Sequence, residues 1–559
     1  MRATNNLRNS LVLIGFLALI VTHTLAHADP LTLHTRSRIE AEKWVPPETH
    51  TKMPMPEPTA SHVIEYTTTT WEGEKTAIIV CDMWDTMINK IPADRVAEMV
   101  PRMNEVLRAA RAKGVLVIHA PSSTMDFYKD TPQRALCVNA PPVETAVPLK
   151  WNHLNEEREG SLPIDDSDNG WEGPLLPGPP PQSRQHPDIE IAPEDAIGDS
   201  KDVYYLLKQR GIENVILLGV HANMCILGRP FGIRQLTYLG MNVTLMRDMT
   251  DSLYNPQMSP KVSHYRGTEM IMEHIEKFWC PTITSTDFVG KPAFRFAGDP
   301  RPHVVFMVSD DHYHADKTLP EFAQQLRETQ GIHATVLDGE GSHTIPGLEN
   351  LETADAVVVY VRRLGLPPEQ IDALKAFVAS GKSVIALRTA SHAFKINFKD
   401  PEGFQVPEGQ AQWVEFDHEI LGGNYHNHGP NMAGTAVRHV AENHPLLNGV
   451  TPRTWHSTGS LYLTQPIAED ATLLMTGSTS DNTEPLTWIR EAVPGRGKVF
   501  YSGLGHPDDF QVPAFQQLML NTVHWALDIT SPSEQFGAKR LDFFVGDSKG
   551  FIILPTKNA

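Results

Sequence analysis

The sequence predicts an α/β protein built from two tandem doubly wound domains, each a mainly parallel sheet in a three-layer α/β/α arrangement. The chain has 559 residues, which exceeds what a single hydrophobic core supports. Continuous apolar runs, as in TAIIVCD at 76–82, alternate with segments of helical periodicity, and this alternation is typical of buried parallel strands joined by helices. It stops near residue 290 and resumes near Arg301.

The N-terminus has the pattern of a secretory signal peptide over residues 1–28. Arg2 and Arg8 precede the apolar run LVLIGFLALIV at 11–21, and Ala26-His27-Ala28 provides a cleavage site of small residues. The run is short for a transmembrane helix, although an uncleaved anchor remains the alternative. The mature protein is therefore predicted to be periplasmic or secreted, with no membrane segment after signal cleavage.

Residues 29–71 are polar and proline-rich and are predicted to form an extended lead-in, and the first domain spans 72–290. Its expected strands are at 76–82, 115–121, 214–220 and 242–248. Its expected helices are at 95–114, at 200–212, after Cys225 and at 262–279. Loop-type sequence between 140 and 193 interrupts the pattern, and we expect this insertion to cover the carboxyl edge of the sheet.

The second domain spans 300–528 and is followed by a tail at 529–559. Its expected strands are at 303–310, 334–339, 355–361, 383–389 and 498–505. Its expected helices are at 319–332, 367–382 and 514–528. The last of these helices has one apolar face, which is typical of packing against a core.

Charge and cysteine content limit the function classes. A net charge of −19 argues against a nucleic-acid or anionic-membrane partner, because both require a basic surface. Four cysteines could form two disulfides in an exported protein, but they do not make a disulfide scaffold, and no pair has zinc-site spacing. The acidic run DDSDNG at 165–170 is either a solvated loop or a calcium loop that lacks a distal Glu. We predict no cofactor and no metal.

Cys225 and Asp82 are the candidate catalytic pair. Cys225 follows a predicted strand and is expected at the start of a helix, where the helix dipole lowers the pKa of a thiol. Asp82 ends the first strand, so in a parallel sheet it reaches the same edge and could exchange a proton with the thiol. On residue types alone, an inert buried cysteine beside a strand-end aspartate remains equally open.

Three stretches, AIIVCDMWDTM, GVHANMCI and YLGMNVTLMRDMTDS, resemble the isochorismatase-like cysteine hydrolases, which include nicotinamidases and carbamoyl-amidohydrolases. The resemblance covers about residues 72–290. It implies that Cys225 is the nucleophile and that Asp82 is the general base and acid. It also implies a cis peptide between Val220 and His221, and an oxyanion hole formed by the backbone amides of His221 and Cys225.

The sequence departs from this family at the catalytic lysine. The usual position reads EIAPEDAIGDS at 190–200, with no lysine before Lys201. We expect the insertion to close over Cys225 and to supply the missing cation, with Lys150 in VPLKWNH as the first candidate and an ordinary surface lysine as the alternative. The family's Asp/His/His metal cluster is not matched by APSSTMDFYKD at 120–130, which argues against nicotinamide as the substrate.

The second unit resembles the ThuA-like (trehalose-utilisation) domains, which share the class I glutamine-amidotransferase-like fold. The resemblance rests on GKSVIALRTASHAF, GGNYHNHGP, ENHPLLNGV, EPLTWIRE and GKVFYSGLGHPDDF, and it covers about residues 300–528. No cysteine follows Cys280, which excludes amidotransferase chemistry. The remaining polar strand-end groups predict a sugar pocket or a metal site, unless they are structural histidines: Arg388, Ser391, His392, His426, His428, His506 and Asp508.

Two functions follow from these observations. The first is an exported cysteine hydrolase that cleaves a C–N bond of a small amide-type substrate through a thioester. The alternative is a carbohydrate-binding or carbohydrate-processing protein that acts through the ThuA-like unit and carries a decayed hydrolase unit. The expected partner is a small molecule, with a carbohydrate and an oligomeric state left open.

Overall fold

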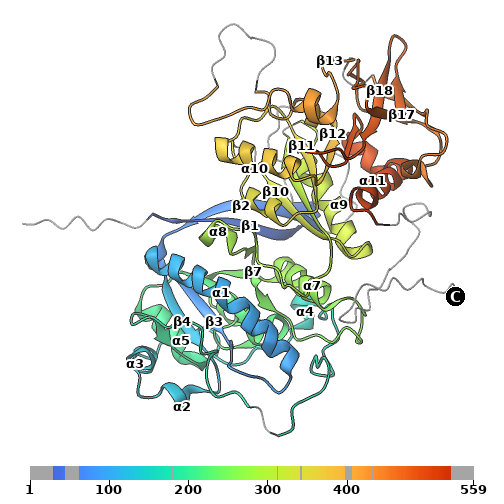
Figure 1. The fold of residues 1–559 in the computed structure, drawn as a ribbon. Coiled ribbons are helices and arrows are strands. Elements are labelled where there is room, and N and C mark those ends of the chain that lie inside the picture. Colours follow the sequence, from blue (N-terminus) through green and yellow to red (C-terminus); the bar gives the residue numbers. More distant parts are fainter. Residues whose placement is uncertain are drawn as a thin grey trace, which may run out of the picture.

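A computed structural model describes residues 29–43, 62–178, 181–310, 312–339, 343–396, 406–430 and 433–529. The predicted signal peptide at 1–28 and nearly all of the tail at 529–559 lie outside these residues. Within them, no helix combines the length and the apolar character needed to cross a bilayer. The structure has two α/β domains stacked end to end, as Figure 1 shows.

The first domain contains an eight-stranded sheet in the order β2-β1-β8-β7-β6-β3-β4-β5. The strands from β8 to β5 run parallel, and β1 runs antiparallel to β8 and to β2. The strands are β1 Leu31–Glu40, β2 His62–Trp71, β3 Thr76–Cys81, β4 Leu116–Ala120, β5 Ala196–Ile197, β6 Asn214–Val220, β7 Asn242–Asp251 and β8 Thr282–Ile283. The helices are α1 Lys90–Ala112, α2 Met125–Tyr128, α3 Pro132–Val138, α4 Glu156–Glu159, α5 Ser200–Gln209, α6 Ile233–Tyr238, α7 His264–Phe278 and α8 Thr286–Val289.

Two stretches of the segment before residue 72, predicted as an extended lead-in, form the long antiparallel pair β1–β2. These strands extend the sheet of the first domain and lie at the boundary between the two domains (Figure 1). Sequence reasoning did not anticipate this pairing, because partner strands separated by a proline-rich stretch carry no local hairpin signal. The pair therefore belongs structurally to the first domain.

The second domain contains a nine-stranded sheet in the order β10-β9-β11-β12-β19-β18-β17-β14-β15, parallel from β10 to β19 and antiparallel beyond. Its strands are β9 His303–Ser309, β10 His333–Asp338, β11 Ala356–Val361, β12 Ser383–Leu387, β14 Thr435–His439, β15 Thr454–Ser457, β17 Ala471–Ser478, β18 Thr483–Arg490 and β19 Val499–Ser502. Strands β13 Asn427–His428 and β16 Tyr462–Leu463 form a separate pair. The helices are α9 Ala315–Thr329, α10 Pro368–Ala379 and α11 Pro513–Ala526.

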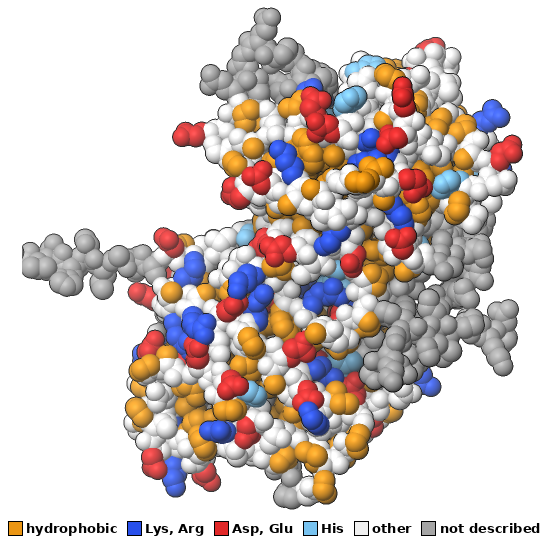
Figure 2. Space-filling view, viewed as in Figure 1, with side chains coloured by type: hydrophobic (Ala, Val, Ile, Leu, Met, Phe, Trp, Pro, Cys, Tyr) orange, Lys and Arg blue, Asp and Glu red, His pale blue; other side chains and the backbone are white. Residues whose placement is uncertain are grey.

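Both domains have the predicted three-layer α/β/α arrangement. Successive residues of a buried strand pack into different core clusters on the two faces of the sheet, as Ile78 and Ile79 do in β3 and Val304 and Val305 do in β9. Helices cover both faces, which explains why these strands are apolar throughout. Figure 2 shows acidic and basic side chains interspersed over the described part of the face in view.

Candidate functional site

The candidate active site of the first domain is at the carboxyl ends of β3 and β6, which are adjacent parallel strands. Cys81, the last residue of β3, pairs with Gly219 of β6, so the residues that follow each strand emerge side by side. Asp82 follows β3 directly and has a left-handed backbone with φ of 49°. Cys225 lies in the π-helical turn Ala222–Ile226 that follows β6. The two predicted residues are thereby brought together.

The Cys225 thiol hydrogen-bonds to the carboxylate of Asp82, and both side chains are buried. Asp82 is fully enclosed, and its Oδ1 accepts the backbone N–H of Ser122 at 2.8 Å. Burial raises the pKa of Asp82, although Arg229, Cys225 and Ser122 act in the opposite direction. A carboxyl group with a raised pKa, in contact with a thiol, is suited to accept and return the thiol proton.

The sequence predicted a lowered pKa for Cys225, and this prediction is wrong for the resting protein. Burial and the Asp82 carboxylate raise the pKa of the thiol well above its ordinary value, although Arg229 and the backbone amide of His221 favour the thiolate. The helix expected after Cys225 is short and interrupted: a π-helical turn spans Ala222–Ile226, and α6 begins only at Ile233. The helix dipole on which the prediction relied is therefore weak, and a buried thiol beside a carboxylate keeps its proton.

The peptide bond between Val220 and His221 is cis, in agreement with the resemblance. The backbone N–H of His221 hydrogen-bonds to the Cys225 sulfur, so a main-chain donor faces the atom predicted to attack the substrate. The His221 ring is itself buried, and burial lowers its pKa to about 4. A neutral ring with this pKa does not contribute a positive charge to the site at pH 7.

The cation of the site is Arg229, which sequence reasoning missed. Its Nε and Nη2 donate to Asp82 Oδ2 at 3.0 and 2.8 Å. Its backbone N–H donates to the carbonyl of Cys225 at 3.0 Å, so a single turn of the chain separates the guanidinium from the thiol. The signal was present in the sequence, since a residue four positions after the cysteine in a helical turn lies on the same side.

Lys150 does not supply this cation, and our expectation for its side chain was wrong. The residue is exposed, and its described hydrogen bonds are made by its backbone, to Gln235 and to Asn152. The neighbouring Trp151 contacts the loop instead: its ring lies 5.3 Å from the Arg229 guanidinium. A flexible, strongly hydrated ammonium remains in water, whereas an indole ring favours the apolar wall of the site.

The insertion at 140–193 contacts the Cys225 loop on several sides. The backbone N–H of Asn152 donates to the carbonyl of Gly228 at 2.7 Å. The side chain of Asn223 donates to Asp166 Oδ2 at 2.9 Å, which engages the acidic run DDSDNG in protein contacts.

In the part of the chain that the structure describes, no group of three His, Cys, Asp or Glu residues is arranged to hold a metal ion. The four cysteines, all within that part, are unpaired.

The second candidate site is at the carboxyl ends of β9, β12 and β19. Arg388 follows β12 with a left-handed φ of 42°, and its buried side chain donates to the carbonyl of Gly503 at 2.8 Å and to the Tyr313 hydroxyl at 3.1 Å. The guanidinium lies 4.1 Å from the ring centre of Tyr313 and 4.8 Å from that of Tyr462. Burial raises the pKa of Tyr313, but the Arg388 charge together with hydrogen bonds from Tyr462, Arg388 and Ser460 outweighs it, and the net pKa is lowered.

Ser391 and His392 lie in the 3-10 turn that begins at Arg388. The His392 ring stacks on Tyr425 at 4.5 Å, and the His428 ring lies 6.3 Å from Tyr462. These aromatic residues were not predicted from sequence, because tyrosines in loops carry no periodic signal. Together they give this edge of the sheet an aromatic wall.

His506 and Asp508 complete the second cluster through Thr458. The Thr458 hydroxyl lies 2.9 Å from His506 Nδ1 and donates to Asp508 Oδ2 at 2.7 Å. The predicted His426 is exposed, and its Nδ1 lies 3.0 Å from the carbonyl oxygen of Asn424. The described contacts thus form an arginine–tyrosine–histidine cluster around Arg388, and His426 contributes none of them.

Comparisons with known proteins agree with this division of the chain. The isochorismatase domain model matches residues 76–259, and the ThuA trehalose-utilisation model matches residues 304–526. The comparison with curated proteins gave no match.

Solved structures similar to this chain include proteins of both types. A ThuA-like protein from Bacteroides uniformis has 14% identity and a TM-score of 0.33, with 43% of this chain and 97% of that chain covered. A cysteine hydrolase from Pseudomonas syringae has 16% identity and a TM-score of 0.26, with 39% and 94% covered. An isochorismatase family protein from Burkholderia thailandensis has 17% identity and a TM-score of 0.24, with 39% and 95% covered. By the two family models, the chain joins an isochorismatase domain to a ThuA-like domain.

Proposed function

We propose that this chain is an exported cysteine hydrolase that cleaves a C–N bond of a small amide-type substrate through a thioester. The observation that carries the proposal is the buried contact between Cys225 and Asp82, with Arg229 on the second carboxylate oxygen. A nucleophile in contact with its base, and a base oriented by a third group, is the arrangement that covalent catalysis requires. Export is supported by the N-terminal pattern at 1–28.

In the proposed reaction, Asp82 takes the Cys225 proton as the sulfur bonds to the substrate carbonyl carbon. The developing oxyanion accepts hydrogen bonds from the backbone amides of His221 and Cys225. When the C–N bond breaks, Asp82 returns the proton to the departing nitrogen. A water molecule, deprotonated by Asp82, then attacks the thioester, and the sulfur leaves with that proton.

Arg229 makes this sequence electrostatically possible. A thiolate beside an aspartate places two negative charges in a buried pocket, and such charges repel strongly where the dielectric constant is low. The Arg229 guanidinium contacts Asp82 and lowers the pKa of Cys225. It therefore takes the electrostatic role that the resemblance assigns to a lysine.

The test is a screen of small amides, ureas and carbamoyl compounds with the purified chain, followed by intact mass measurement of the trapped acyl-enzyme. The expected result is ammonia or amine release by the wild type and a covalent adduct at Cys225. Cys225→Ala is expected to lose both while its thermal unfolding stays close to that of the wild type. Turnover that survives Cys225→Ala would refute the proposed nucleophile.

The cluster around Arg388 favours a second function, the binding of a carbohydrate by the ThuA-like domain. Aromatic faces and a buried guanidinium at a strand-end edge are groups that contact sugar rings and hydroxyls. Calorimetric titration with trehalose and other glucosides tests this function. Binding is expected to weaken at least tenfold in Tyr425→Ala and to be unchanged in Cys225→Ala. If none of these sugars binds, this second function is wrong.

A further inference from the structure

A cavity of about 180 Å³ lies between the two domains. Its wall includes β1, β2 and β7 of the first domain and α9 and β10 of the second, and it contains none of Asp82, Cys225 or Arg388. This volume corresponds to on the order of a dozen water molecules, which is room for a small polar ligand. The cavity is thus separate from both strand-end sites.

Three arginines and a tyrosine meet at this cavity. Arg36 of β1 pairs in register with Tyr66 of β2 and also with Thr282 of β8. The hydroxyl of Thr282 accepts a hydrogen bond from Arg247 Nη1 at 3.2 Å, which places Arg247 beside that pair. Arg327 comes from α9 of the second domain. Burial and then the charge of Arg36 lower the pKa of both Arg247 and Arg327 to about 10, so the Arg36 guanidinium is close enough to repel each of the other two.

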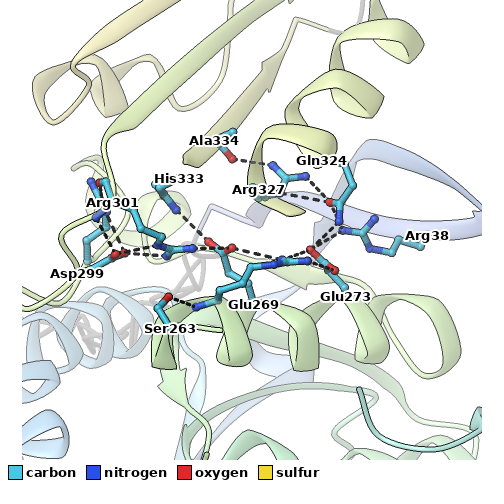
Figure 3. A network of polar contacts seen from close by, with 12 residues as sticks. Arg38, Ser263, Glu269, Glu273, Asp299, Arg301, Gln324, Arg327, His333 and Ala334 are labelled. Carbon is cyan, nitrogen blue, oxygen red and sulfur yellow. Dashed lines mark hydrogen bonds and ion pairs between the residues drawn. The ribbon is translucent and has the colours of Figure 1, made fainter. Parts of the chain in front are cut away.

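Two of these guanidiniums have no carboxylate within ion-pair distance among the described residues. The described hydrogen bond of Arg247 goes to Thr282, and those of Arg327 go to the carbonyl of Ala334 and the side chain of Gln324. Figure 3 shows the Arg327 contacts beside the inter-domain network. An arginine charge at an enclosed site without a directly paired carboxylate is unfavourable, and a bound anion would offset this cost.

The nearby carboxylates are engaged by other arginines. Glu276 pairs with Arg36 at 2.7 Å and with Arg38 at 3.2 Å. Glu273 pairs with Arg266 at 2.6 Å. They therefore act on Arg247 and Arg327 only from beyond ion-pair distance, and burial together with the charge of Arg36 outweighs them.

The other carboxylates on the cavity wall have donors of their own. Asp248 accepts hydrogen bonds from Ser285 and from the backbone of Phe294. Glu269 pairs with Arg301 at 2.8 Å and with His333 at 3.0 Å (Figure 3).

The hydroxyl of Tyr66 is a further unmatched donor. It is buried and has no hydrogen-bond partner among the described residues. Its charge interactions with Arg36, Arg247 and Arg327 place it within the arginine group. Buried hydroxyl groups are nearly always hydrogen-bonded, so an orphan among unpaired cations indicates an absent acceptor.

We propose that this inter-domain cavity binds a small oxyanion, a carboxylate or a phosphate, through Arg247, Arg327 and Tyr66, with Arg36 adding positive charge. Guanidinium groups hold such oxyanions through paired hydrogen bonds, and the phenol donates a further one. Because the donors come from β2, β7 and α9, the bound anion links the two domains. The site depends on the fusion of the domains and is independent of the proposed hydrolase reaction.

The test is isothermal titration of the full chain with orthophosphate and, separately, with succinate, at constant ionic strength set with chloride. We expect saturable binding of one of these oxyanions at one site per chain. Arg247→Met and Arg327→Met should each weaken that binding at least tenfold, and Tyr66→Phe, which removes only the hydroxyl oxygen, severalfold. Arg438→Met is the matched control, because Arg438 is exposed on β14, and it should bind as the wild type does.

Thermal unfolding provides a second readout, because the Tm increase caused by the oxyanion is measured within each variant and does not depend on the variant's own stability. Arg247→Met should raise the Tm in oxyanion-free buffer, because it removes a half-buried charge that has no ion-pair partner among the described residues, and should abolish the Tm increase caused by the oxyanion. The proposal is overturned if neither oxyanion binds the wild type saturably. It is also overturned if both arginine variants keep wild-type affinity, or if chloride alone reproduces the Tm increase. Binding of phosphate alone would identify the ligand as a phosphate, and binding of succinate alone would identify it as a carboxylate.

Discussion

The Arg229 guanidinium donates two hydrogen bonds to one oxygen of Asp82, from Nε at 3.0 Å and from Nη2 at 2.8 Å. The other oxygen of the same carboxylate accepts the backbone N–H of Ser122 at 2.8 Å. With both oxygens engaged, the carboxylate has a fixed orientation toward Cys225. The nucleophile and its proton acceptor are thereby buried together, beside the half-buried Arg229 that carries the positive charge of the site.

Replacing Arg229 by Gln should make Cys225 less reactive. The guanidinium lowers the pKa of the thiol, so its loss raises that pKa further and reduces the thiolate fraction at every pH below it. We expect alkylation of Cys225 by iodoacetamide at about pH 8 to slow by roughly tenfold, which corresponds to about one pKa unit. Lys150→Gln is the matched control and should alkylate at the wild-type rate, since the Lys150 side chain is exposed. A slower rate in the Lys150 variant would show that Lys150 acts on Cys225 after all.

Replacing Asp82 by Asn should have the opposite effect on alkylation. The Asp82 carboxylate raises the pKa of Cys225 through its charge and its hydrogen bond, so the neutral amide should lower that pKa and speed alkylation. Turnover, in contrast, should fall by about 10²-fold or more, because the proton acceptor is removed. The measurement is the alkylation rate as a function of pH, with Cys225→Ala defining the contribution of the other thiols. An unchanged midpoint would show that Asp82 and Cys225 do not interact in solution.

Replacing Glu159 by Gln should release the insertion from the domain. Glu159 of α4 accepts hydrogen bonds from Arg234 at 2.8 and 2.9 Å and from the Trp279 indole at 2.7 Å, and its Oε2 lies 2.9 Å from His274 Nε2. Removing one member of a buried charged network costs about 3 kcal/mol. Urea unfolding at about pH 7 should show this loss, whereas Glu157→Gln, on the exposed face of the same helix, should show little.

The pH dependence of this loss has a defined sign. Burial raises the pKa of Glu159, but the hydrogen bonds from His274, Arg234, Asn155 and Trp279 outweigh it and lower the pKa from 4.5 to about 2. A lowered folded-state pKa gives stability that is present above pH 4.5 and disappears as the pH falls toward 2. The difference between wild type and Glu159→Gln should shrink over this interval, and a difference that grows there would contradict the assignment.

Adding a methyl group at Gly219 should strain the backbone where β3 and β6 end beside the active site. A Cβ at this position would lie 2.0 Å from the carbonyl oxygen of Cys81, and φ is +107°. The clash is with main chain that cannot rotate away, so Gly219→Ala should cost about 3 kcal/mol in the free energy of unfolding. Gly240→Ala, also at positive φ but with nothing within 4 Å, should cost about 1 kcal/mol. Equal losses in both variants would mean that the two strand ends are not closely packed.

The sequence by itself determined the fold class, the division into two domains and the positions of Cys225 and Asp82. Buried parallel strands are apolar throughout, and the residue that ends each one reaches a common edge, so these features are encoded locally. The cis peptide between Val220 and His221 followed from the resemblance and is confirmed. The pairing of strand 31–40 with strand 62–71 was not predicted, because it joins segments without a local turn signal.

Only the tertiary structure decided the electrostatics. The sign of the Cys225 pKa shift depends on burial and on the distance to Asp82, and neither quantity is written in the order of residues. That Arg229 and not the predicted Lys150 pairs with Asp82 likewise depends on which cation the folded loop places against the carboxylate. The meeting of Tyr66, Arg247 and Arg327 requires two sheets and a helix to pack together, because residues so distant in the chain become neighbours only through the docking of one domain on the other.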